Sequence, residues 1–231
     1  MRITFLNTWD GRGGEPLFDF ISEESSKTDI FCLQEVKEPL YKKILETLSD
    51  FNGSRITRPQ HINDWSFDQV IFSKKDMEIS VFENEILTVG TGQAAKIILN
   101  GKEVLLFNFQ GVSMPGEKFD TEERINQSGQ ILNFVSKYDL PKIIGGDFNL
   151  MPDTKSIEMM EEAGLTNLIK KFGIKETRNR LAWEFYKDQP GFIEQHFADY
   201  VFISPEIKIN NFQVIDNEAS DHLPMILDFD L

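Results

Sequence analysis

The chain has 231 residues, enough for one compact domain with a sizeable core, and we expect a single domain over residues 1–231. Lys and Arg total 24 and Asp and Glu total 38, which gives a net charge of −14. So acidic a chain disfavours binding along an extended polyanion, because that binding depends on Lys and Arg neutralising phosphates. No apolar stretch approaches the ~20 residues of a membrane span. With no signal-peptide pattern and a single cysteine, the sequence indicates a cytoplasmic protein.

Short apolar runs of strand type alternate with amphipathic stretches in the first half of the chain. Asn100-Gly101 is typical of a type I′ turn between two hairpin strands. Apolar residues at helical spacing predict a helix over 40–48, and a proline predicts another helix opening at 16–21. The strands expected here are 3–6, 30–33, 96–99 and 104–109.

The second half continues the alternation. Asp120 resembles the first residue of a capping box that opens a helix to about Tyr138. A further helix is expected over about 155–163, closed by Gly164. Strands are expected at 143–144, 200–203 and 224–229. Mixed strands and helices around one core predict a layered α/β fold.

Polar residues stand at the ends of these predicted strands. The strands at 3–6, 30–33 and 143–144 run into polar residues, whereas the last two strands are preceded by them. If the last two strands run antiparallel to the first three, all of these groups meet at one edge of the sheets. The residues concerned are Asn7, Gln34, Glu35, Asp147, Asn149, Asp199, Ser220, Asp221 and His222.

Four carboxylates in this set cannot all ionise side by side without a counter-charge. Hard oxygen ligands suit magnesium, manganese or calcium rather than zinc, and the sequence has only three histidines, no cysteine pair and no His-x-x-x-His spacing. We therefore expect Mg²⁺, with Mn²⁺ as the second choice. Taken singly, each residue also has a structural interpretation: Asp147 as a turn former, Glu35 as a solvated strand end, His222 as a hydrogen-bonded loop residue.

In this order along one chain, the residues resemble the motifs of the endonuclease/exonuclease/phosphatase family, which includes abasic-site endonucleases, pancreatic-type deoxyribonucleases and bacterial sphingomyelinases. The resemblance covers nearly the whole chain and is specific for the family but not for a substrate. It implies a four-layer α/β/β/α sandwich of two mixed β-sheets flanked by helices. The matching segments are Asn7, Leu33-Gln34-Glu35-Val36, Gly146-Asp147-Phe148-Asn149, Ala198-Asp199-Tyr200-Val201 and Ser220-Asp221-His222.

The resemblance implies catalytic roles for four residues. Asp147 would orient and deprotonate the attacking water, and Asn149 would hold a phosphate oxygen. His222 would stabilise charge on the phosphate, while Asp199 would fix the orientation of that histidine and raise its pKa. In-line attack on phosphorus needs such charge neutralisation and a base within hydrogen-bond reach of the water.

The resemblance also implies a metal site and a departure from the family pattern. Glu35 would bind the metal with help from Asn7, and Asp221 would lie near the metal or the leaving group. Many family members carry an Asn-x-His pattern near the end of the middle hairpin, where this chain has Asn108 and Gln110. Glutamine can donate a hydrogen bond to a phosphate oxygen but cannot donate a proton at neutral pH.

Several cationic residues are further candidates for substrate contact. Lys118 and Arg124 lie in a segment, Gly116 to Gln127, that resembles a bacterial branch of the family, although surface charge at a helix start explains them equally well. In an island of positive charge over 170–180, Arg178 or Arg180 would bind a second phosphate if it reaches the site; a solvated face is the other interpretation. The aromatic residues at 9, 65, 183, 185 and 186 could stack a base or pack in the core.

The predicted function is divalent-metal-dependent hydrolysis of a phosphodiester or phosphomonoester, by a nuclease or nucleotide phosphodiesterase that holds nucleic acid only locally. One alternative is a phosphatase or phosphodiesterase that acts on small or lipid-derived esters. Another is a weakly catalytic metal-binding protein. We expect no obligate protein partner.

Overall fold

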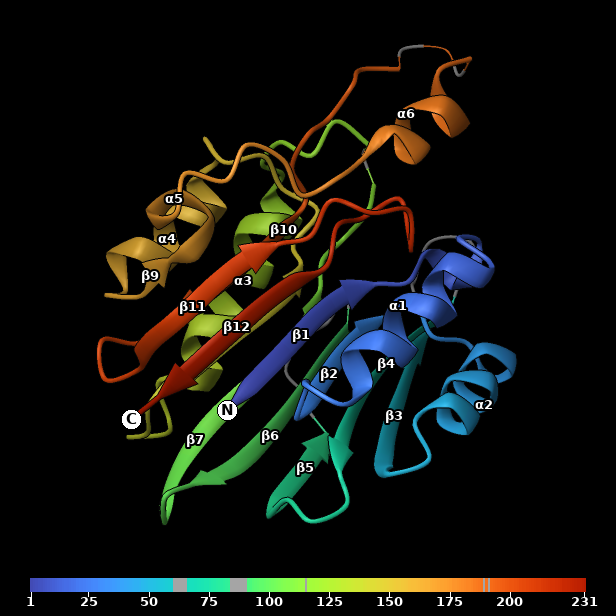
Figure 1. Ribbon diagram of the computed structural model, residues 1–231. Coiled ribbons are helices and arrows are strands. Elements are labelled where there is room, and N and C mark those ends of the chain that lie inside the picture. The colour runs from blue at the N-terminus through green and yellow to red at the C-terminus, as the bar shows by residue number, and fades with distance from the viewer. Residues whose placement is uncertain (60–65, 84–90, 115, 189, 191) are drawn as a thin grey trace.

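Two six-stranded mixed sheets lie face to face, with helices on their outer sides (Figure 1). The computed structural model describes the chain apart from residues 60–65, 84–90, 115, 189 and 191. Sheet A has the strand order β11-β12-β1-β2-β4-β3 and sheet B the order β5-β6-β7-β8-β10-β9. The strands of sheet A are β1 (Arg2–Asn7), β2 (Ile30–Gln34), β3 (Phe51–Pro59), β4 (Ser66–Lys74), β11 (Lys208–Val214) and β12 (Met225–Asp230). Those of sheet B are β5 (Ile79–Glu83), β6 (Thr91–Leu99), β7 (Lys102–Gln110), β8 (Lys142–Asp147), β9 (Thr166–Asn167) and β10 (Asp199–Ile203).

The helices complete four layers. Two of them, α1 and α2, bury their apolar faces against sheet A, whereas α3 and α4 cover sheet B. This arrangement confirms the predicted α/β/β/α sandwich. The helices are η1 (Trp9–Gly11, a 3-10 turn), α1 (Glu15–Ser25), α2 (Glu38–Thr47), α3 (Glu122–Val135), α4 (Lys155–Glu162), α5 (Leu168–Lys171) and α6 (Arg180–Tyr186). In the described part of the chain, no helix combines the length and apolar character needed to cross a membrane.

Strand direction brings the polar strand ends to one edge, as the sequence predicted. In sheet A, β1 and β2 are parallel while β12 is antiparallel to β1. In sheet B, β7 and β8 are parallel while β10 is antiparallel to β8. The carboxyl ends of β1, β2, β7 and β8 therefore share an edge with the amino ends of β10 and β12.

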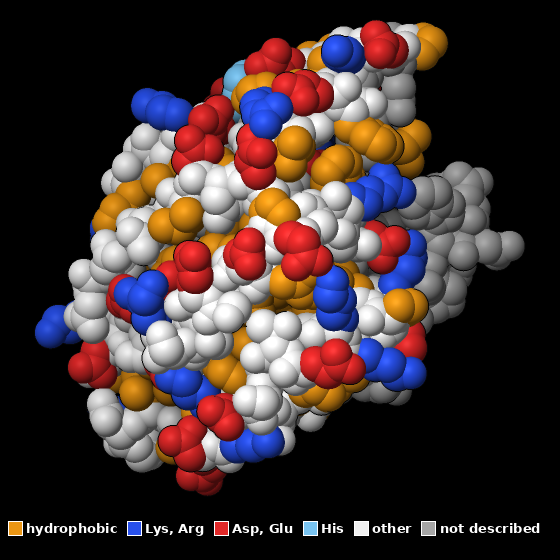
Figure 2. Space-filling model, turned by 45° about the vertical axis from the view of Figure 1, so that its right-hand side comes forward, with side chains coloured by type: hydrophobic (Ala, Val, Ile, Leu, Met, Phe, Trp, Pro, Cys, Tyr) orange, Lys and Arg blue, Asp and Glu red, His pale blue; other side chains and the backbone are white. Residues whose placement is uncertain are grey.

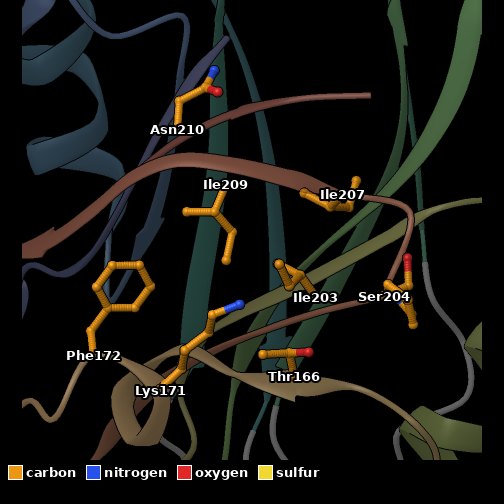
Figure 3. Close-up of a pocket in the computed structure, with 9 residues that line it drawn as sticks. Thr166, Lys171, Phe172, Ile203, Ser204, Ile207, Ile209 and Asn210 are labelled. Carbon is orange, nitrogen blue, oxygen red and sulfur yellow. The ribbon is translucent and has the colours of Figure 1, made fainter.

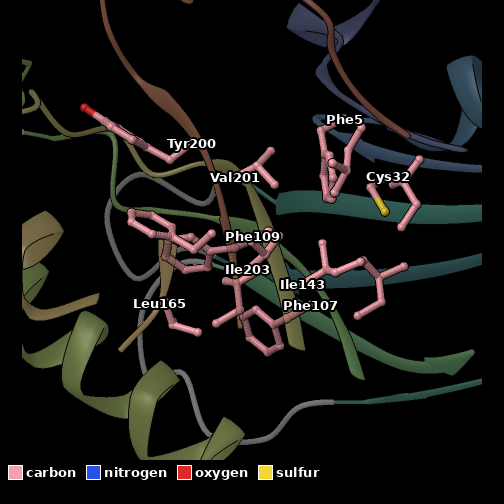
Figure 4. Packing of buried hydrophobic residues seen from close by; sticks show 14 of the residues in the cluster. Phe5, Cys32, Phe107, Phe109, Ile143, Leu165, Tyr200, Val201 and Ile203 are labelled. Atoms are coloured by element: carbon pink, nitrogen blue, oxygen red, sulfur yellow. The ribbon is translucent and has the colours of Figure 1, made fainter. Parts of the chain in front are cut away.

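The two sheets pack tightly against each other beside Gly145. A Cβ atom at Gly145 would lie 2.7 Å from the Phe5 ring, so only glycine allows β8 of sheet B to approach β1 of sheet A this closely. Phe5 and Cys32 extend from sheet A into this layer (Figure 4). Phe107 lies on the helix side of sheet B, with its ring 5.7 Å from that of Phe134 in α3.

The predicted turn at Asn100-Gly101 is confirmed, whereas the predicted helix cap at Asp120 is not. Asn100 and Gly101, at φ 53° and 76°, join β6 to β7 in the predicted hairpin. The capping prediction for Asp120 was wrong, because Thr121 caps α3 by accepting from the backbone N of Arg124. Asp120 instead accepts hydrogen bonds from the first turn of α4, at Lys155 N and Ser156 N. Its carboxylate therefore stabilises the amino end of the neighbouring helix.

Candidate active site

Three polar side chains of sheet B form a row across neighbouring strands. Gln110 of β7 pairs in register with Asp147 of β8, which pairs in register with Asp199 of β10. Residues directly opposite in adjacent strands present their side chains on the same face of a sheet. All three side chains are buried, with exposed fractions of 2% or less. The row therefore faces the layer between the sheets at its polar edge.

Sheet A contributes Asn7 and Glu35 opposite this row. Asn7 ends β1 and pairs with Gln34 of β2, directly before Glu35. Glu35 adopts φ 59°, an uncommon conformation for a residue with a side chain. The Thr8 hydroxyl donates to the carbonyls of Gln34 and Glu35 at 2.9 and 3.0 Å and so holds this turn.

Amide groups join the two sheets at the site. Asn7 Nδ2 donates to Glu35 Oε1 at 3.1 Å and to Asp147 Oδ2 at 2.9 Å. Gln110 Nε2 donates to the same Glu35 oxygen at 2.9 Å. Asn149, which has φ 53°, donates to Asp147 from its backbone N at 2.9 Å and from Nδ2 at 3.0 Å. Asp147 is thus held in one orientation by amide donors from both sheets.

His222 lies against Asp199, and the pair is buried. His222 Nδ1 is 2.8 Å from Asp199 Oδ2, while Nε2 is 4.0 Å from Asp147 Oδ2 and 3.8 Å from Asp221 Oδ1. Burial opposes protonation of the imidazole, but the charges of Asp199, Asp221 and Asp147 outweigh it and raise the pKa of His222 to about 9. His222 is therefore an imidazolium at neutral pH.

Arg178 reaches the site, whereas Arg180 does not. Arg178 forms an isolated antiparallel bridge with His222, and its Nη2 lies 2.6 Å from Asp221 Oδ2. Asp221, expected near the metal or leaving group, is thus paired with a buried guanidinium. Arg180 pairs with Glu184 and Glu218 on the surface.

Lys118 and Arg124 lie close in sequence but differ in what they contact. Lys118 is buried and donates from Nζ to Asn149 Oδ1. The Arg124 guanidinium donates to backbone carbonyls, among them those of Phe119 at 2.6 Å and Val112 at 3.1 Å. Arg124 thus holds the segment that carries Lys118, an arrangement different from the substrate contact expected of it.

Asn108 is placed away from the site, which contradicts the expectation of substrate contact. Its exposed fraction is 0%, and its Oδ1 accepts from Gln34 Nε2 at 2.6 Å. Its Nδ2 donates to the carbonyls of Leu33 and Val70, both 3.3 Å away. Asn108 lies on the same face of β7 as Gln110, but it is two residues further from the polar edge and is covered by sheet A. It connects the two sheets instead of facing substrate.

Two of the aromatic residues considered for substrate contact pack against each other beside the site. Trp9 and Phe185 meet edge to face at 5.4 Å, with the Arg12 guanidinium 5.8 and 5.4 Å from the two rings. This contact joins η1, directly after Asn7, to α6. Trp65, the other tryptophan considered for the mouth of the site, lies outside the described residues.

Two threonines that the sequence did not single out hold the backbone of site residues through their hydroxyl groups. Thr8 holds the Glu35 turn, and Thr177 Oγ1 accepts from the backbone N of Ala198 and of Asp199 at 3.0 and 3.1 Å. Each is adjacent in sequence to a candidate residue, Asn7 or Arg178, which is the signal that could have found them.

A separate hollow lies away from this site, between α5 and the β10–β11 turn (Figure 3). It is lined by residues such as Lys171, Phe172 and Ile203. Ile203 is at the opposite end of β10 from Asp199, so the hollow shares no residue with the candidate site.

The donor set fits a divalent cation at Glu35. Burial raises the pKa of the Glu35 carboxyl, and among the described residues no Lys, Arg or His lies within ion-pair distance of it. Gln110 Oε1 is also buried, and no described residue donates a hydrogen bond to it. An unbalanced carboxylate beside an unpaired amide oxygen suits Mg²⁺ or Mn²⁺.

Asp147, Asp199 and His222 are a second geometric possibility, since one ligand atom from each lies within 4.8 Å of the others. A protonated imidazole cannot bind a metal, however, and His222 is already engaged by Asp199 through Nδ1. Glu35, beside Gln110 Oε1, is therefore the better candidate ligand, whereas Asn7 Oδ1 is already engaged by Trp9 N at 2.9 Å.

Residues 7–222 match the Endonuclease/Exonuclease/phosphatase family, and the chain belongs to this family. Its members are hydrolytic phosphoesterases. No curated protein sequence matches the chain.

Solved structures with the same fold include proteins with different activities or ligands. A mannosyl-6-phosphatase of Bacteroides thetaiotaomicron aligns with TM-score 0.72 and 17% identity, covering 100% of both chains. TDP2 of D. rerio, complexed with a single-strand DNA product, aligns with TM-score 0.73 and 15% identity, covering 100% of this chain and 99% of that one. The human nocturnin catalytic domain with bound sulfate gives TM-score 0.66 and 18% identity, over 100% and 94%. At such identities the likeness establishes the fold and leaves the substrate open.

Proposed function

We propose that this protein hydrolyses small phosphate esters with the help of Mg²⁺ or Mn²⁺. The observation that carries the proposal is the free side of the His222 imidazolium. Its Nδ1 is held by Asp199, while Nε2 lies beyond hydrogen-bond distance of both nearby carboxylates, at 3.8 and 4.0 Å. That N–H is therefore available to a phosphoryl oxygen, next to a carboxylate that can take a proton from water.

Each residue has a definite task in this mechanism. Asp147 accepts the proton of the attacking water, because Asn7 and Asn149 orient its carboxylate. As the water oxygen bonds to phosphorus, the P–O bond to the leaving group breaks and the leaving group departs as an alkoxide or phenolate. His222 donates from Nε2 to a phosphoryl oxygen and balances the charge that develops there. Glu35, with Gln110 Oε1 beside it, would hold a divalent cation, which would supply Lewis-acid polarisation of the phosphoryl group.

The distribution of charge favours small esters over polynucleotides. Within the positive island at 170–180, Lys170 pairs with Glu161 at 2.6 Å, Arg178 with Asp221 at 2.6 Å and Arg180 with Glu184 at 2.8 Å. Basic and acidic side chains are interspersed on the face shown in Figure 2. Long nucleic acids need unpaired cations along their path, and this chain carries a net charge of −14.

An activity panel tests the proposal. With Mg²⁺ or Mn²⁺, we expect turnover of p-nitrophenyl phosphate or bis-p-nitrophenyl phosphate, and little cleavage of single-stranded DNA, duplex DNA or RNA. EDTA should abolish turnover. Preferential cleavage of a polynucleotide would establish the nuclease interpretation instead, and turnover unchanged in EDTA would exclude the metal mechanism.

Two variants test the residue assignments. Asp147→Asn removes the proton acceptor but keeps the shape of the side chain, and His222→Ala removes the imidazolium. Each should lower kcat by about a hundredfold or more. Asp153→Asn, which changes an exposed carboxylate on a nearby turn, serves as the matched control for charge. Full activity in the first two variants would show that the residues are assigned wrongly.

A further inference from the structure

Two buried cations, Lys118 and Arg178, lie at the site in addition to His222. Their exposed fractions are 6% and 9%, which is unusual for residues that normally keep their charges in water. They come from distant parts of the chain: Lys118 follows β7, and Arg178 forms an isolated antiparallel bridge with His222. Burying a charged group is costly unless a partner balances it.

The backbone around Lys118 is built to hold its side chain inward. Lys118 adopts φ 57°, its carbonyl accepts from Met151 N at 2.8 Å, and Arg124 binds the carbonyls on either side. Its ammonium donates to Asn149 Oδ1, whose own Nδ2 donates to Asp147. Lys118 thus contacts the residue expected to hold a phosphate oxygen.

Arg178 keeps one donor unused. Its Nη2 is paired with Asp221, but Nε is buried and has no hydrogen-bond partner among the described residues. A buried unsatisfied donor costs free energy, so it is usually retained where a ligand supplies the acceptor.

Lys118 and Arg178 also repel each other. Burial and, after it, the charge of Arg178 lower the pKa of Lys118 to about 8, against the opposing effect of Asp147 and Asp199. Two buried like charges that act on each other are both stabilised when an anion binds beside them.

We infer that Lys118 and Arg178 form an anion site that receives the second negative charge of a terminal phosphate, so that the protein prefers phosphomonoesters to phosphodiesters. The inference rests on the proposed function, because it assigns a substrate class to the same site. A monoester carries close to two negative charges above its second pKa of about 6, whereas a diester carries one. Only the monoester has an additional anionic oxygen for these two cations.

The test compares two esters with the same leaving group. We expect Lys118→Met to lower kcat/KM for p-nitrophenyl phosphate by roughly ten- to hundredfold, and for bis-p-nitrophenyl phosphate by less than about threefold. Lys118→Arg should restore most of the monoester activity. Lys102→Met, at the far end of β7 and exposed, removes the same charge from a distant place and should change neither substrate. Equal losses on both esters in Lys118→Met would overturn the inference.

The pH dependence of the ratio between the two activities gives a second readout. His222 and Asp147 serve both esters, so their titrations cancel in the ratio. The charged groups that face Lys118 are Asp147, Asp199, Arg178 and Arg124. We expect the monoester preference to be greatest between about pH 6 and 8, to fall above pH 8 as Lys118 loses its proton, and to persist above pH 8 in Lys118→Arg. A ratio that does not change through pH 8 in the wild type contradicts the inference.

Binding of inorganic phosphate separates this inference from the proposed function. Calorimetry at pH 7 should show phosphate binding to the wild-type protein and to Lys102→Met, and at least tenfold weaker binding to Lys118→Met. If neither ester is turned over, the proposed function fails, while the phosphate titration still decides the anion site. If Lys118→Met binds phosphate as tightly as the wild type, the anion site is wrong even when both esters are hydrolysed.

Discussion

Replacing Lys118 with methionine should stabilise the fold at pH 7 while it weakens substrate binding. The pKa of the buried ammonium falls from 10.5 to about 8, with burial as the main cause. At about 1.4 kcal/mol for each pKa step, the folded state holds this charge at a cost of roughly 3 kcal/mol. Methionine removes that cost but loses the hydrogen bond to Asn149, worth about 1–1.5 kcal/mol. We expect a net gain of about 1–2 kcal/mol in the free energy of unfolding.

The sign of the pH dependence follows from the same values. Below about pH 8 Lys118 is charged in both the folded and the unfolded chain, so the full cost is present. Between about pH 8 and 10.5 the unfolded chain binds more protons than the folded chain, so the wild type gains stability as the pH rises. The advantage of Lys118→Met should therefore shrink across this range. The variant carries no lysine at this position, so the difference between the two proteins isolates the effect of Lys118.

Urea denaturation at pH 7 and at pH 10, followed by far-UV circular dichroism, measures both effects. At pH 7 the midpoint of Lys118→Met should lie above that of the wild type, with the difference largely lost at pH 10. Lys102→Met controls for the change in net charge. A variant less stable than the wild type at pH 7, or a difference that stays constant with pH, would refute the reasoning about the buried charge.

Three further substitutions address separate features. Asp199→Asn should lower the pKa of His222 from about 9, which NMR of the imidazole protons measures. The charged imidazole stabilises the folded wild-type protein fully below about pH 6.5, and this stabilisation is lost as the pH rises through 9, so the variant should lack it. An unchanged pKa would contradict the pairing. Glu35→Gln should keep the fold, since the amide still accepts from its neighbours, but lower kcat/KM by roughly a hundredfold with a weaker Mg²⁺ dependence; an unchanged metal titration would exclude Glu35 as a ligand. Asn108→Ala should destabilise the protein by about 2–3 kcal/mol, because Gln34 loses its buried partner, yet leave kcat/KM of the folded enzyme unchanged; a selective loss of activity would return Asn108 to the site.

The predictable part of the fold consists of the elements with the strongest sequence signals. In the described part of the chain, all four helices of eight or more residues were anticipated, whereas α5 and α6, with four and seven residues, were not. Among the strands, the interior strand β4 was missed, because the buried polar residues Asp68, Gln69 and Ser73 interrupt its apolar run. The four sheet edges β3, β5, β9 and β11 were missed as well. An edge strand has a neighbour on one side only and buries fewer side chains, so its sequence is more polar and lacks a continuous apolar run. The β11 strand shows this, with only Phe212 buried.

The site was predictable where position along a strand decided the outcome. Asn7, Asp147 and Asp199 stand at strand ends, and strand polarity alone predicts that they converge. Depth and direction could not be read in the same way. Asn108 is two residues before Gln110 and shares its face, but only the sheet-to-sheet distance shows that Asn108 is covered.

The cationic residues show a related limit. Lys118 and Arg124 have similar charge and lie six residues apart, and nothing in the sequence says which of them reaches the site. Both side chains turn inward, with exposed fractions of 6% and 1%, but only Lys118 reaches Asn149 at the site, because of its positive φ and because backbone carbonyls take up the Arg124 guanidinium. Such contacts arise from tertiary packing, which residue patterns do not encode locally.

The close approach of Phe5 to Gly145 has a consequence for how the protein loses function on heating. Glu35 and Asn7 belong to one sheet and Asp147 and Asp199 to the other, so the distances between these groups depend on how the two layers sit on each other. A small sliding of the layers leaves every backbone ladder intact and still separates the groups by enough to stop turnover. On heating, the proposed hydrolytic activity should therefore fall several degrees below the temperature at which the strands unfold.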